Sequence, residues 1–488
     1  MKTNVRPNIV LISVDQMRRD CMGISGHPVV ETPNLDQMRL QGWQFTHAYS
    51  ATPSCIPARA ALLTGQSQER HGRVGYQDGI DWHYEHTLAG EFAAAGYHTY
   101  AVGKMHVAPE RNLMGFHHVV LHDGYHQFDR DMQVAQEDGH PAHDDYLLWL
   151  KRELGTDTDL LDSGLGCNSW IARPFPYAEK YHPTNWTVSE SIDFLRRKDP
   201  TKPFFLYVSF IRPHSPLDAP QYYFDLYDRK EFPAPAADDW SDMENAEQMG
   251  LNVNAFRGKI PDAAMHRAQA SYYGLITHID HQIGRLLQAM ADYRLMKNTI
   301  FVFLSDHGDM MGDHHFFRKA VPYEGSAGIP FLIYDPGNLL EGRKNVQVQC
   351  LTELRDVMPT LLDMAGIPIP DSVDGKSLLP VLRGEQEQVR EYLHGEHSFR
   401  AYSNQFIVTT RDKYIWFTQS GEEQYFDLEN DPQEQHNLIH SPEKQARIQE
   451  LRSCLIHELE NREEGFVENG CLVTGRKPLN ILTNLQNQ

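Results

Sequence analysis

The chain has 488 residues, 41% of them hydrophobic, and a formal net charge of −21. This length is typical of one large and one smaller domain, each with its own core. The acidic charge argues against nucleic acid or an anionic membrane surface as a partner. A site for an anionic substrate must therefore concentrate positive charge locally.

Strand and helix patterns alternate through most of the chain. Short β-branched and aromatic runs predict strands, and apolar residues at three- and four-residue spacing predict helices. In chain order we expect strands at 8–14, 97–102, 204–210, 299–304 and 331–334, and helices at 88–95, 187–197, 264–290 and 356–365. This alternation predicts an α/β fold with a mainly parallel central sheet flanked by helices on both faces.

The pattern changes after residues 366–370, where the segments become shorter and more polar. We expect strands at 405–409 and 414–417 and a helix at 443–460. These elements predict a larger domain over residues 1–367 and a smaller C-terminal α+β domain over residues 368–488. The tail, 471–488, has too little periodicity to assign.

The first residues lead directly into the strand at 8–14 and contain no apolar signal-peptide core. No later apolar run is long enough to span a bilayer. We therefore expect a cytoplasmic protein, or a periplasmic one if a leader has been removed. The six cysteines form neither a CxxC pair nor a regular framework, so the sequence indicates neither a zinc site nor a disulfide scaffold.

The motif Cys-Ile-Pro-Ala-Arg at residues 55–59 opens an apolar helical run. Pro57 suits a first helical turn, where a missing N–H costs nothing. Cys55 then lies at a helix N-terminus, which favours an anion such as sulfate. Arg59, one turn later, shares a face with Cys55 and can pair with that anion. Taken alone, the motif fits a buried Cys before an ordinary helix equally well.

Two pairs of polar residues follow predicted strands and suggest a metal site. Asp15 and Gln16 follow the first strand, and Asp306 and His307 follow the strand at 299–304. Ligands of open α/β sheets bind at such carboxyl ends. The oxygen-rich set favours calcium, while the imidazole leaves manganese or magnesium open. Each pair taken alone also fits a plain turn at a strand end.

Four further cationic or imidazole side chains lie near predicted strand ends. Lys104 and His106 follow the strand at 97–102, His214 follows the strand at 204–210, and Lys319 lies a short loop after His307. A single such Lys is usually solvated, and a single such His is usually structural. Their common place at strand ends predicts one site.

In this order and at these separations the motifs resemble those of the type I sulfatases, in which the Cys is oxidised to formylglycine (3-oxoalanine). The stretch 96–106, with Gly-Tyr, a strand and then Gly-Lys-Met-His, resembles the second motif of that family. The resemblance extends from Pro-Asn-Leu-Asp at 33–36 to the Tyr-Phe-Asp-Leu and Asn-Leu segments within 425–438. It implies an alkaline-phosphatase-like fold.

The resemblance implies an arylsulfatase-type sulfuric ester hydrolase that acts on an aryl, carbohydrate or choline sulfate after a maturing enzyme has modified Cys55. The catalytic residues that it implies are Cys55, Arg59, Lys104, His106, His214 and Lys319. The metal ligands that it implies are Asp15, Gln16, Cys55, Asp306 and His307.

In the implied mechanism, the metal and Arg59 hold the aldehyde hydrate, and one of its hydroxyls attacks sulfur. Lys104 and Lys319 neutralise the sulfate oxygens. His214, with Lys319, protonates the leaving oxygen of the alcohol. His106 then assists proton removal from the second hydroxyl, so that the carbon–oxygen bond to the sulfate breaks, sulfate leaves and the aldehyde forms again. The identity of the alcohol stays open, because the region 117–173 could line a sugar, aryl or choline pocket. A homo-oligomer also stays open.

Three departures from the family pattern bear on this assignment. Most members carry Asp-Asp where this chain has Asp15-Gln16, and many carry Asp-Asn where it has Asp306-His307. The third is Ile56, where a small residue is usual. The Asp-Gln and Asp-His pairs of this chain resemble those of the choline sulfatases and the related phosphonate monoester hydrolases.

Two other functions fit parts of the same pattern. A phosphonate or phosphate ester hydrolase on the same scaffold is the main rival. Those relatives lack the Lys-x-His pair that this chain has at Lys104 and His106. That pair favours sulfate. A non-catalytic anion-binding protein is disfavoured because no catalytic residue of the family pattern is missing.

Overall fold

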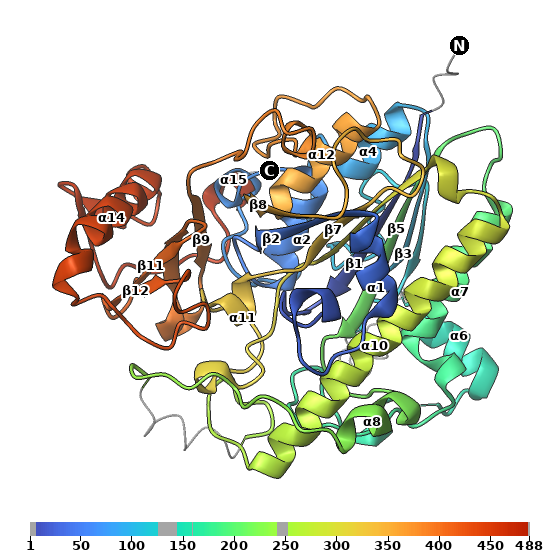
Figure 1. Cartoon of the computed structure of the whole chain (residues 1–488), viewed down its shortest axis with the longest axis horizontal. Coiled ribbons are helices and arrows are strands. Elements are labelled where there is room, and N and C mark those ends of the chain that lie inside the picture. Colours follow the sequence, from blue (N-terminus) through green and yellow to red (C-terminus); the bar gives the residue numbers. More distant parts are fainter. Residues whose placement is uncertain (1–5, 125–143, 159, 242–251, 487–488) are drawn as a thin grey trace.

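Two sheets organise the computed structural model, which describes residues 6–124, 144–158, 160–241 and 252–486 (Figure 1). The larger sheet has the strand order β4-β3-β5-β1-β6-β7-β2-β8. Its strands are β1 Asn8–Asp15, β2 Gly42–Tyr49, β3 His98–Gly103, β4 His118–Leu121, β5 Phe204–Pro213, β6 Thr299–Ser305, β7 Phe331–Tyr334 and β8 Val346–Glu353. Neighbouring strands run parallel, except that β7 is antiparallel to β6 and to β2. The α/β fold with a mainly parallel sheet is confirmed.

Strand β1 shows how both faces of this sheet are covered. Ile9 and Leu11 pack into one core, whereas Val10 and Ile12 pack into another. Because side chains alternate along a strand, this continuous apolar run is buried on both sides. The first face carries α2 Cys55–Thr64, α4 Leu88–Ala94, α12 Val357–Met364 and α13 Leu379–Leu382. The second carries α1 Pro33–Leu40, α6 Asp145–Leu154, α7 Pro183–Arg197, α8 Gln221–Asp228 and α10 Asp262–Asp292 (Figure 1).

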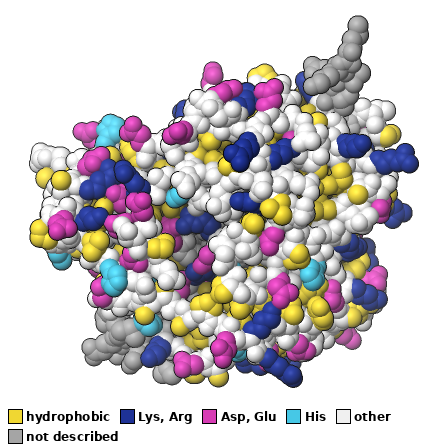
Figure 2. All heavy atoms as spheres, in the orientation of Figure 1, with side chains coloured by type: hydrophobic (Ala, Val, Ile, Leu, Met, Phe, Trp, Pro, Cys, Tyr) yellow, Lys and Arg dark blue, Asp and Glu magenta, His cyan; other side chains and the backbone are white. Residues whose placement is uncertain are grey.

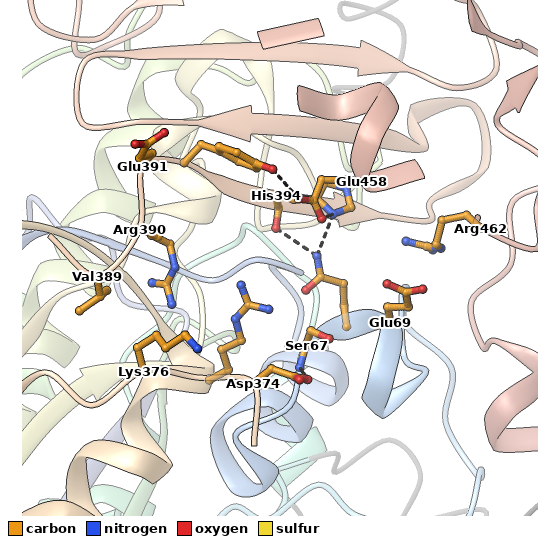
Figure 3. Close-up of a pocket in the computed structure, with 13 residues that line it drawn as sticks. Ser67, Glu69, Asp374, Lys376, Val389, Arg390, Glu391, His394, Glu458 and Arg462 are labelled. Carbon is orange, nitrogen blue, oxygen red and sulfur yellow. Dashed lines mark hydrogen bonds and ion pairs between the residues drawn. The ribbon is translucent and has the colours of Figure 1, made fainter. Parts of the chain in front are cut away.

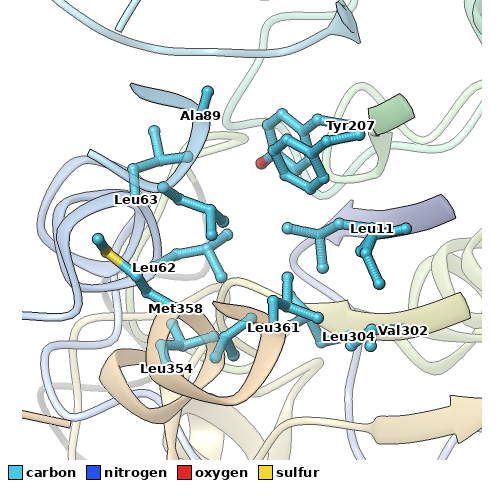
Figure 4. Close-up of a cluster of buried hydrophobic side chains, with 14 of the residues drawn as sticks. Leu11, Leu62, Leu63, Ala89, Tyr207, Val302, Leu304, Leu354, Met358 and Leu361 are labelled. Atoms are coloured by element: carbon cyan, nitrogen blue, oxygen red, sulfur yellow. The ribbon is translucent and has the colours of Figure 1, made fainter. Parts of the chain in front are cut away.

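Helix α2 is enclosed by the first core. All ten of its residues are buried. Figure 4 shows Leu62 and Leu63 of α2 among Leu11 of β1, Leu304 of β6 and Leu361 of α12. Burying one leucine side chain contributes roughly 1.5–3 kcal/mol. This packing holds the N-terminus of α2, with Cys55 as its first residue, against the sheet.

The smaller C-terminal unit is built on an antiparallel sheet in the order β12-β11-β10-β9. Its elements are β9 Leu393–His397, β10 Asn404–Val408, β11 Asp412–Phe417, β12 Glu423–Asp427 and α14 Gln445–Leu459. Phe406 and Ile415 on one face pack against residues of the larger unit such as Tyr323. Ile407 and Tyr414 on the other face pack against α14. The sheet is therefore held between α14 and the larger unit.

The predicted helices and strands are all present, with ends that shift by a few residues. The helix predicted at 264–290 is α10, and the helix predicted at 443–460 is α14. Strands β2, β4, β8, β9 and β12 and helices α1, α6 and α8 were not predicted. The tail left unassigned forms β14 Cys471–Leu472, which pairs with β13 Val467–Glu468, and α15 Thr483–Gln486.

A cavity of about 420 Å³ lies where the two units meet (Figure 3). Glu69 and Arg355 of the larger unit line it together with His394, Glu458 and Arg462 of the smaller one. None of the residues predicted for catalysis or metal binding lines this cavity. It therefore belongs to the junction of the two units.

On the face drawn in Figure 2, basic and acidic side chains are interspersed. The six cysteines carry free thiols. Within the described ranges, no helix is both long and apolar enough to cross a bilayer.

Candidate active site

Four adjacent strands of the large sheet bring the predicted residues to one edge. Strands β3, β5, β1 and β6 are neighbours in that order. Asp15 ends β1, Lys104 follows β3, His214 follows β5 and Asp306 follows β6. Because these strands are parallel, their carboxyl ends meet, which is where α/β sheets bind ligands.

Cys55 lies over this edge as the first residue of α2, after an extended Ser54. Its Sγ is 3.1 Å from Lys319 Nζ, 3.3 Å from His307 Nε2 and 3.8 Å from Asp15 Oδ1. These neighbours come from the end of β1 and from the loop after β6. The thiol is fully buried. Position 55 is therefore the point on which the predicted residues converge.

The turn after β3 requires a glycine. Gly103 has φ 98°, and a Cβ there would lie 1.9 Å from the carbonyl oxygen of Ser209 on β5. The next residue, Lys104, donates its backbone N–H to the same oxygen at 2.9 Å. The side chain of Lys104 then contacts the carboxylate of Asp15. The tight approach of β3 to β5 thus places a buried cation beside Asp15.

His106 lies in a backbone turn that Asp123 holds. It has φ 54°, and the Asp123 carboxylate accepts the N–H groups of Met105 at 2.8 Å and His106 at 3.0 Å. The imidazole interacts with the Cys55 side chain, and its Nε2 lies 3.8 Å from Asp78. His106 is therefore placed between Cys55 and a carboxylate.

Arg59 is fully buried behind Cys55 and links the metal candidates to the sheet. Its Nε donates to Asp306 Oδ2 at 3.1 Å. Its Nη1 donates to the Lys104 carbonyl at 2.8 Å, to Tyr207 Oη at 3.1 Å and to Ser209 Oγ at 2.9 Å. These bonds direct the guanidinium to Asp306 and β5. In this structure Arg59 holds Asp306 beside Cys55.

Asp15, Cys55, Asp306 and His307 each offer one ligand atom, and these atoms lie within 4.8 Å of one another. The orientation of His307 suits a metal ligand, because its Nδ1 donates to the Gly308 carbonyl at 2.9 Å. That bond leaves Nε2 with its lone pair toward the site. Gln16 adds an amide whose Oε1 lies 2.9 Å from Lys319 Nζ. Two carboxylates, an imidazole and an amide fit a divalent ion.

The charges around Cys55 shift its pKa downward. Burial raises the pKa of the thiol, but Lys104, Lys319 and His307 lower it more, so it lies well below its ordinary value. For Asp15, burial and Cys55 raise the pKa, and the opposing lysines and His214 outweigh them, so the net shift is also downward. The site therefore concentrates the positive charge that an anionic substrate needs.

The pKa shifts of Asp306 and His307 favour an additional cation in the site. Burial and the neighbouring Asp15 raise the pKa of Asp306. Burial lowers the pKa of His307, but Asp306 and Cys55 raise it more. The net shift is upward, so the imidazole stays positively charged to a higher pH than an ordinary histidine side chain. Both shifts favour the protonated form of the side chain, whereas a metal ion binds the deprotonated form. A divalent ion would relieve the repulsion between the two carboxylates.

His214 completes the site from the end of β5. Its backbone N–H donates to the carbonyl of Asp15 at 3.0 Å, which joins the two strand ends. Its Nδ1 donates to the Ser215 carbonyl at 2.7 Å, so Nε2 is the atom available to a substrate. Burial and then Lys319 lower the pKa of His214.

The structure brings together all the predicted site residues, which are Asp15, Gln16, Cys55, Arg59, Lys104, His106, His214, Asp306, His307 and Lys319. Reasoning from the sequence did not assign roles to Asp309, which binds Gln16, or to Asp123 and Asp78 beside His106. Asp309 lies three residues after Asp306, at the end of the stretch Asp-His-Gly-Asp at 306–309. No sequence signal marked the other two, because only the fold brings them to the site.

The region 117–173, expected to line the substrate pocket, is described only in part. Residues 125–143 and 159 lie outside the described residues. Within the described part, the carbonyl of Asn168 accepts a hydrogen bond from Arg318 at 2.8 Å. Arg318 precedes Lys319, so this region reaches the rim of the site.

A model of the sulfatase family matches residues 7–367 of this chain. The chain belongs to the sulfatase family. A second model, described as the C-terminal part of N-sulphoglucosamine sulphohydrolase, matches residues 312–462. The resemblance seen in the motifs is thereby confirmed, and this sulfatase is an enzyme that hydrolyses sulfate esters.

Individual relatives and solved structures are similar to this chain over nearly its whole length. The sulfatase is 56% identical to an arylsulfatase of Clostridium perfringens over 482 residues, which cover 99% of this chain and 100% of that protein. It is 28% identical to a choline-sulfatase of Rhizobium meliloti, over 90% of this chain and 84% of the relative. Among solved structures, the phosphonate monoester hydrolase of Agrobacterium radiobacter has a TM-score of 0.77 and 28% identity, covering 93% of this chain and 95% of the other.

Proposed function

We propose that this sulfatase cleaves aryl or carbohydrate sulfate monoesters, using formylglycine made from Cys55 and one divalent metal ion, with calcium the first choice. The observation that carries the proposal is the position of Cys55, whose Sγ lies 3.1 Å from Lys319 Nζ and 3.3 Å from His307 Nε2. The Sγ marks the place that an oxygen of the hydrated aldehyde would take. The hydrate would supply a hydroxyl nucleophile, which the unmodified thiol does not have.

Asp15, Gln16, Asp306 and His307 would hold the metal, which would polarise the nucleophile and offset the two carboxylates. Arg59 keeps Asp306 in place through its hydrogen bond of 3.1 Å. This geometry supports a preformed site, because the ligands are oriented by bonds to the protein before any ion binds. Manganese and magnesium are the alternatives that the same ligands allow.

The remaining residues divide the work on the substrate between them. Lys104 and Lys319 both interact electrostatically with position 55 and can neutralise the sulfate oxygens as charge develops. His214 offers its Nε2 near the same point and, together with Lys319, is our candidate for protonating the leaving oxygen. His106 interacts with position 55 and is our candidate for removing a proton there.

A phosphonate or phosphate ester hydrolase is the second candidate function. The observation that favours it is the likeness to the phosphonate monoester hydrolase of Agrobacterium radiobacter, at 28% identity and a TM-score of 0.77. Lys104 and His106 argue for sulfate, because the motif of the phosphonate hydrolases lacks this pair. Both side chains contact the Cys55 site in the structure, so their presence has a chemical consequence.

A substrate panel tests the proposal. Protein produced together with a maturing enzyme would be assayed on sulfate, phosphate and phosphonate esters of one aryl alcohol, and on choline and monosaccharide sulfates. We expect the aryl or monosaccharide sulfate to be turned over best and phosphate to act mainly as an inhibitor. A preference for the phosphonate ester, with Lys104→Ala harmless, would support the second candidate instead. A preference for choline sulfate would correct the substrate class.

A further inference from the structure

Asp309 is a buried carboxylate close to the proposed metal ligands, with only 4% of its surface exposed. Its two oxygens bind different partners. Oδ1 accepts the backbone N–H groups of Met311 at 2.8 Å and Arg318 at 2.9 Å. Oδ2 accepts a hydrogen bond from Gln16 Nε2 at 2.6 Å. One oxygen therefore closes the loop that leads to Lys319, and the other binds the Gln16 side chain.

This second bond decides which way the amide of Gln16 faces. An ionised carboxylate only accepts hydrogen bonds, so the amide nitrogen must point to Asp309. The amide oxygen must then point the other way, where Oε1 accepts from Lys319 Nζ at 2.9 Å. The same ammonium group lies 3.1 Å from Cys55 Sγ. Asp309 thus turns an oxygen of Gln16 toward the reacting centre.

The backbone of Gln16 is held as firmly as its side chain. The residue is fully buried and has φ 71°, in the left-handed region that glutamine seldom adopts. Its N–H donates to Asp306 Oδ1 at 3.2 Å, and its carbonyl accepts from Tyr272 Oη at 2.7 Å. With the backbone fixed in this way, the rotation of the terminal amide is the freedom that Asp309 removes.

We propose that Asp309 is a positioning residue, which orients the Gln16 amide as a neutral oxygen ligand and joins it to the loop that carries Lys319. This inference deepens the metal site of the proposed function and rests on it. It also accounts for a glutamine at position 16. A carboxylate there would lie within hydrogen-bond distance of Asp309, where two negative charges repel.

The test exchanges the amide of Gln16 and the carboxylate of Asp309. Asp309→Asn keeps the size of the side chain and can still accept the two loop N–H groups, but it presents an NH₂ to the NH₂ of Gln16. The amide of Gln16 must then rotate and direct nitrogen toward Lys319. In the double variant Gln16→Glu with Asp309→Asn, the donor and acceptor are matched again, an oxygen faces Lys319, and the net charge equals that of the native protein.

The first measurement is calcium affinity of metal-depleted protein by titration calorimetry. We expect Asp309→Asn to weaken binding by about ten- to a hundredfold, as is typical for partners of metal ligands. The double variant should recover native affinity or exceed it. Asp313→Asn is the matched control, because Asp313 lies on the same loop and pairs with Arg18 but does not contact Gln16. It should lower the Tm without changing calcium affinity.

The second measurement needs no metal. The Tm of the four proteins (native, each single variant and the double) forms a double-mutant cycle. We expect the double variant to melt at a higher temperature than the sum of the two single shifts predicts. Additive shifts, or a double variant that binds calcium no better than Asp309→Asn, would overturn the inference. A native protein that binds no divalent ion would refute the proposed metal site, and the cycle in Tm would still decide whether Asp309 orients Gln16.

Discussion

The ammonium group of Lys319 lies 3.1 Å from the Sγ of Cys55. Its neighbours in the chain, Arg318 and Ala320, both have positive φ, at 69° and 74°. The backbone therefore turns sharply on either side of Lys319 to deliver its side chain to position 55. A cation held this close to the nucleophile position can stabilise negative charge as it forms there.

The first prediction concerns Cys55 itself. We expect protein made together with a maturing enzyme to carry formylglycine at this position, because the thiol alone does not provide the hydroxyl nucleophile. Mass spectrometry of the peptide that contains Cys55 would show the conversion. The prediction is wrong if fully active protein contains only the unmodified thiol. Inactive protein with a free thiol would agree with it.

The second prediction concerns the two lysines. We expect Lys104→Ala and Lys319→Ala each to lower kcat on an aryl sulfate by about a hundredfold or more, since each removes a charged donor from the site. Lys376→Ala is the control, because Lys376 lines the cavity between the two units (Figure 3). It should keep native turnover. Comparable rates in all three variants would contradict the assignment of Lys104 and Lys319.

The third prediction concerns Asp306. We expect Asp306→Asn to remove calcium binding and sulfatase activity, because it deletes a negative ligand. In calcium-containing buffer the free energy of unfolding should also fall, because the variant loses the stabilisation that an ion bound only to the folded state contributes. Elemental analysis and urea unfolding would measure the two effects. An active variant, or active native protein without a divalent metal, would refute the role of Asp306.

The fourth prediction concerns acid stability. Burial and then the charge of Arg73 lower the pKa of His71 to about 3, whereas the unfolded chain has an ordinary histidine pKa near 6.5. Below pH 6.5 His71 therefore binds a proton in the unfolded state but not in the native state. The free energy of unfolding consequently falls as the pH drops toward 3. This effect reaches a few kcal/mol at most, since one pKa unit is worth about 1.4 kcal/mol.

His71→Asn tests this linkage. Asn can still accept the N–H of Arg73, which now donates to His71 Nδ1 at 3.2 Å. We expect a smaller decline of Tm between pH 6.5 and 4.5 than in the native protein. His440→Asn, at an exposed position, should leave the native decline unchanged. Equal declines in all three proteins would show that His71 is not responsible.

The fifth prediction concerns Lys413, which joins the two units of the fold. Its ammonium group is fully buried and lies 2.8 Å from Glu324 and 2.7 Å from Glu434. Lys413→Ala leaves two buried carboxylates without this partner, and we expect a loss of about 3–5 kcal/mol in the free energy of unfolding. Lys444→Ala breaks a more exposed pair with Asp427 and should cost less than about 1 kcal/mol. Urea unfolding of both variants decides the point.

Periodicity alone predicted most of the fold, because burial on both faces leaves a clear trace in the sequence. The strand at 8–14 is apolar at nearly every position, and β1 packs into both cores. Strand β2 was not predicted, although Trp43 to Thr46 alternate between apolar and polar residues, and the structure defines it by its pairing with β7 and β8. The antiparallel direction of β7 likewise depends on partners far away in the chain.

For the site, helix starts and strand ends predicted that Cys55 and Asp306 lie at one edge of a parallel sheet, and the resemblance to the sulfatase motifs implied their roles and that of Lys319. Only the tertiary structure decided which of them touch. It directs Arg59 to Asp306, and it brings Asp309 within 2.6 Å of Gln16, although 293 positions separate the two residues. Contacts of this kind depend on strand order and loop closure, and neither can be predicted from the local sequence.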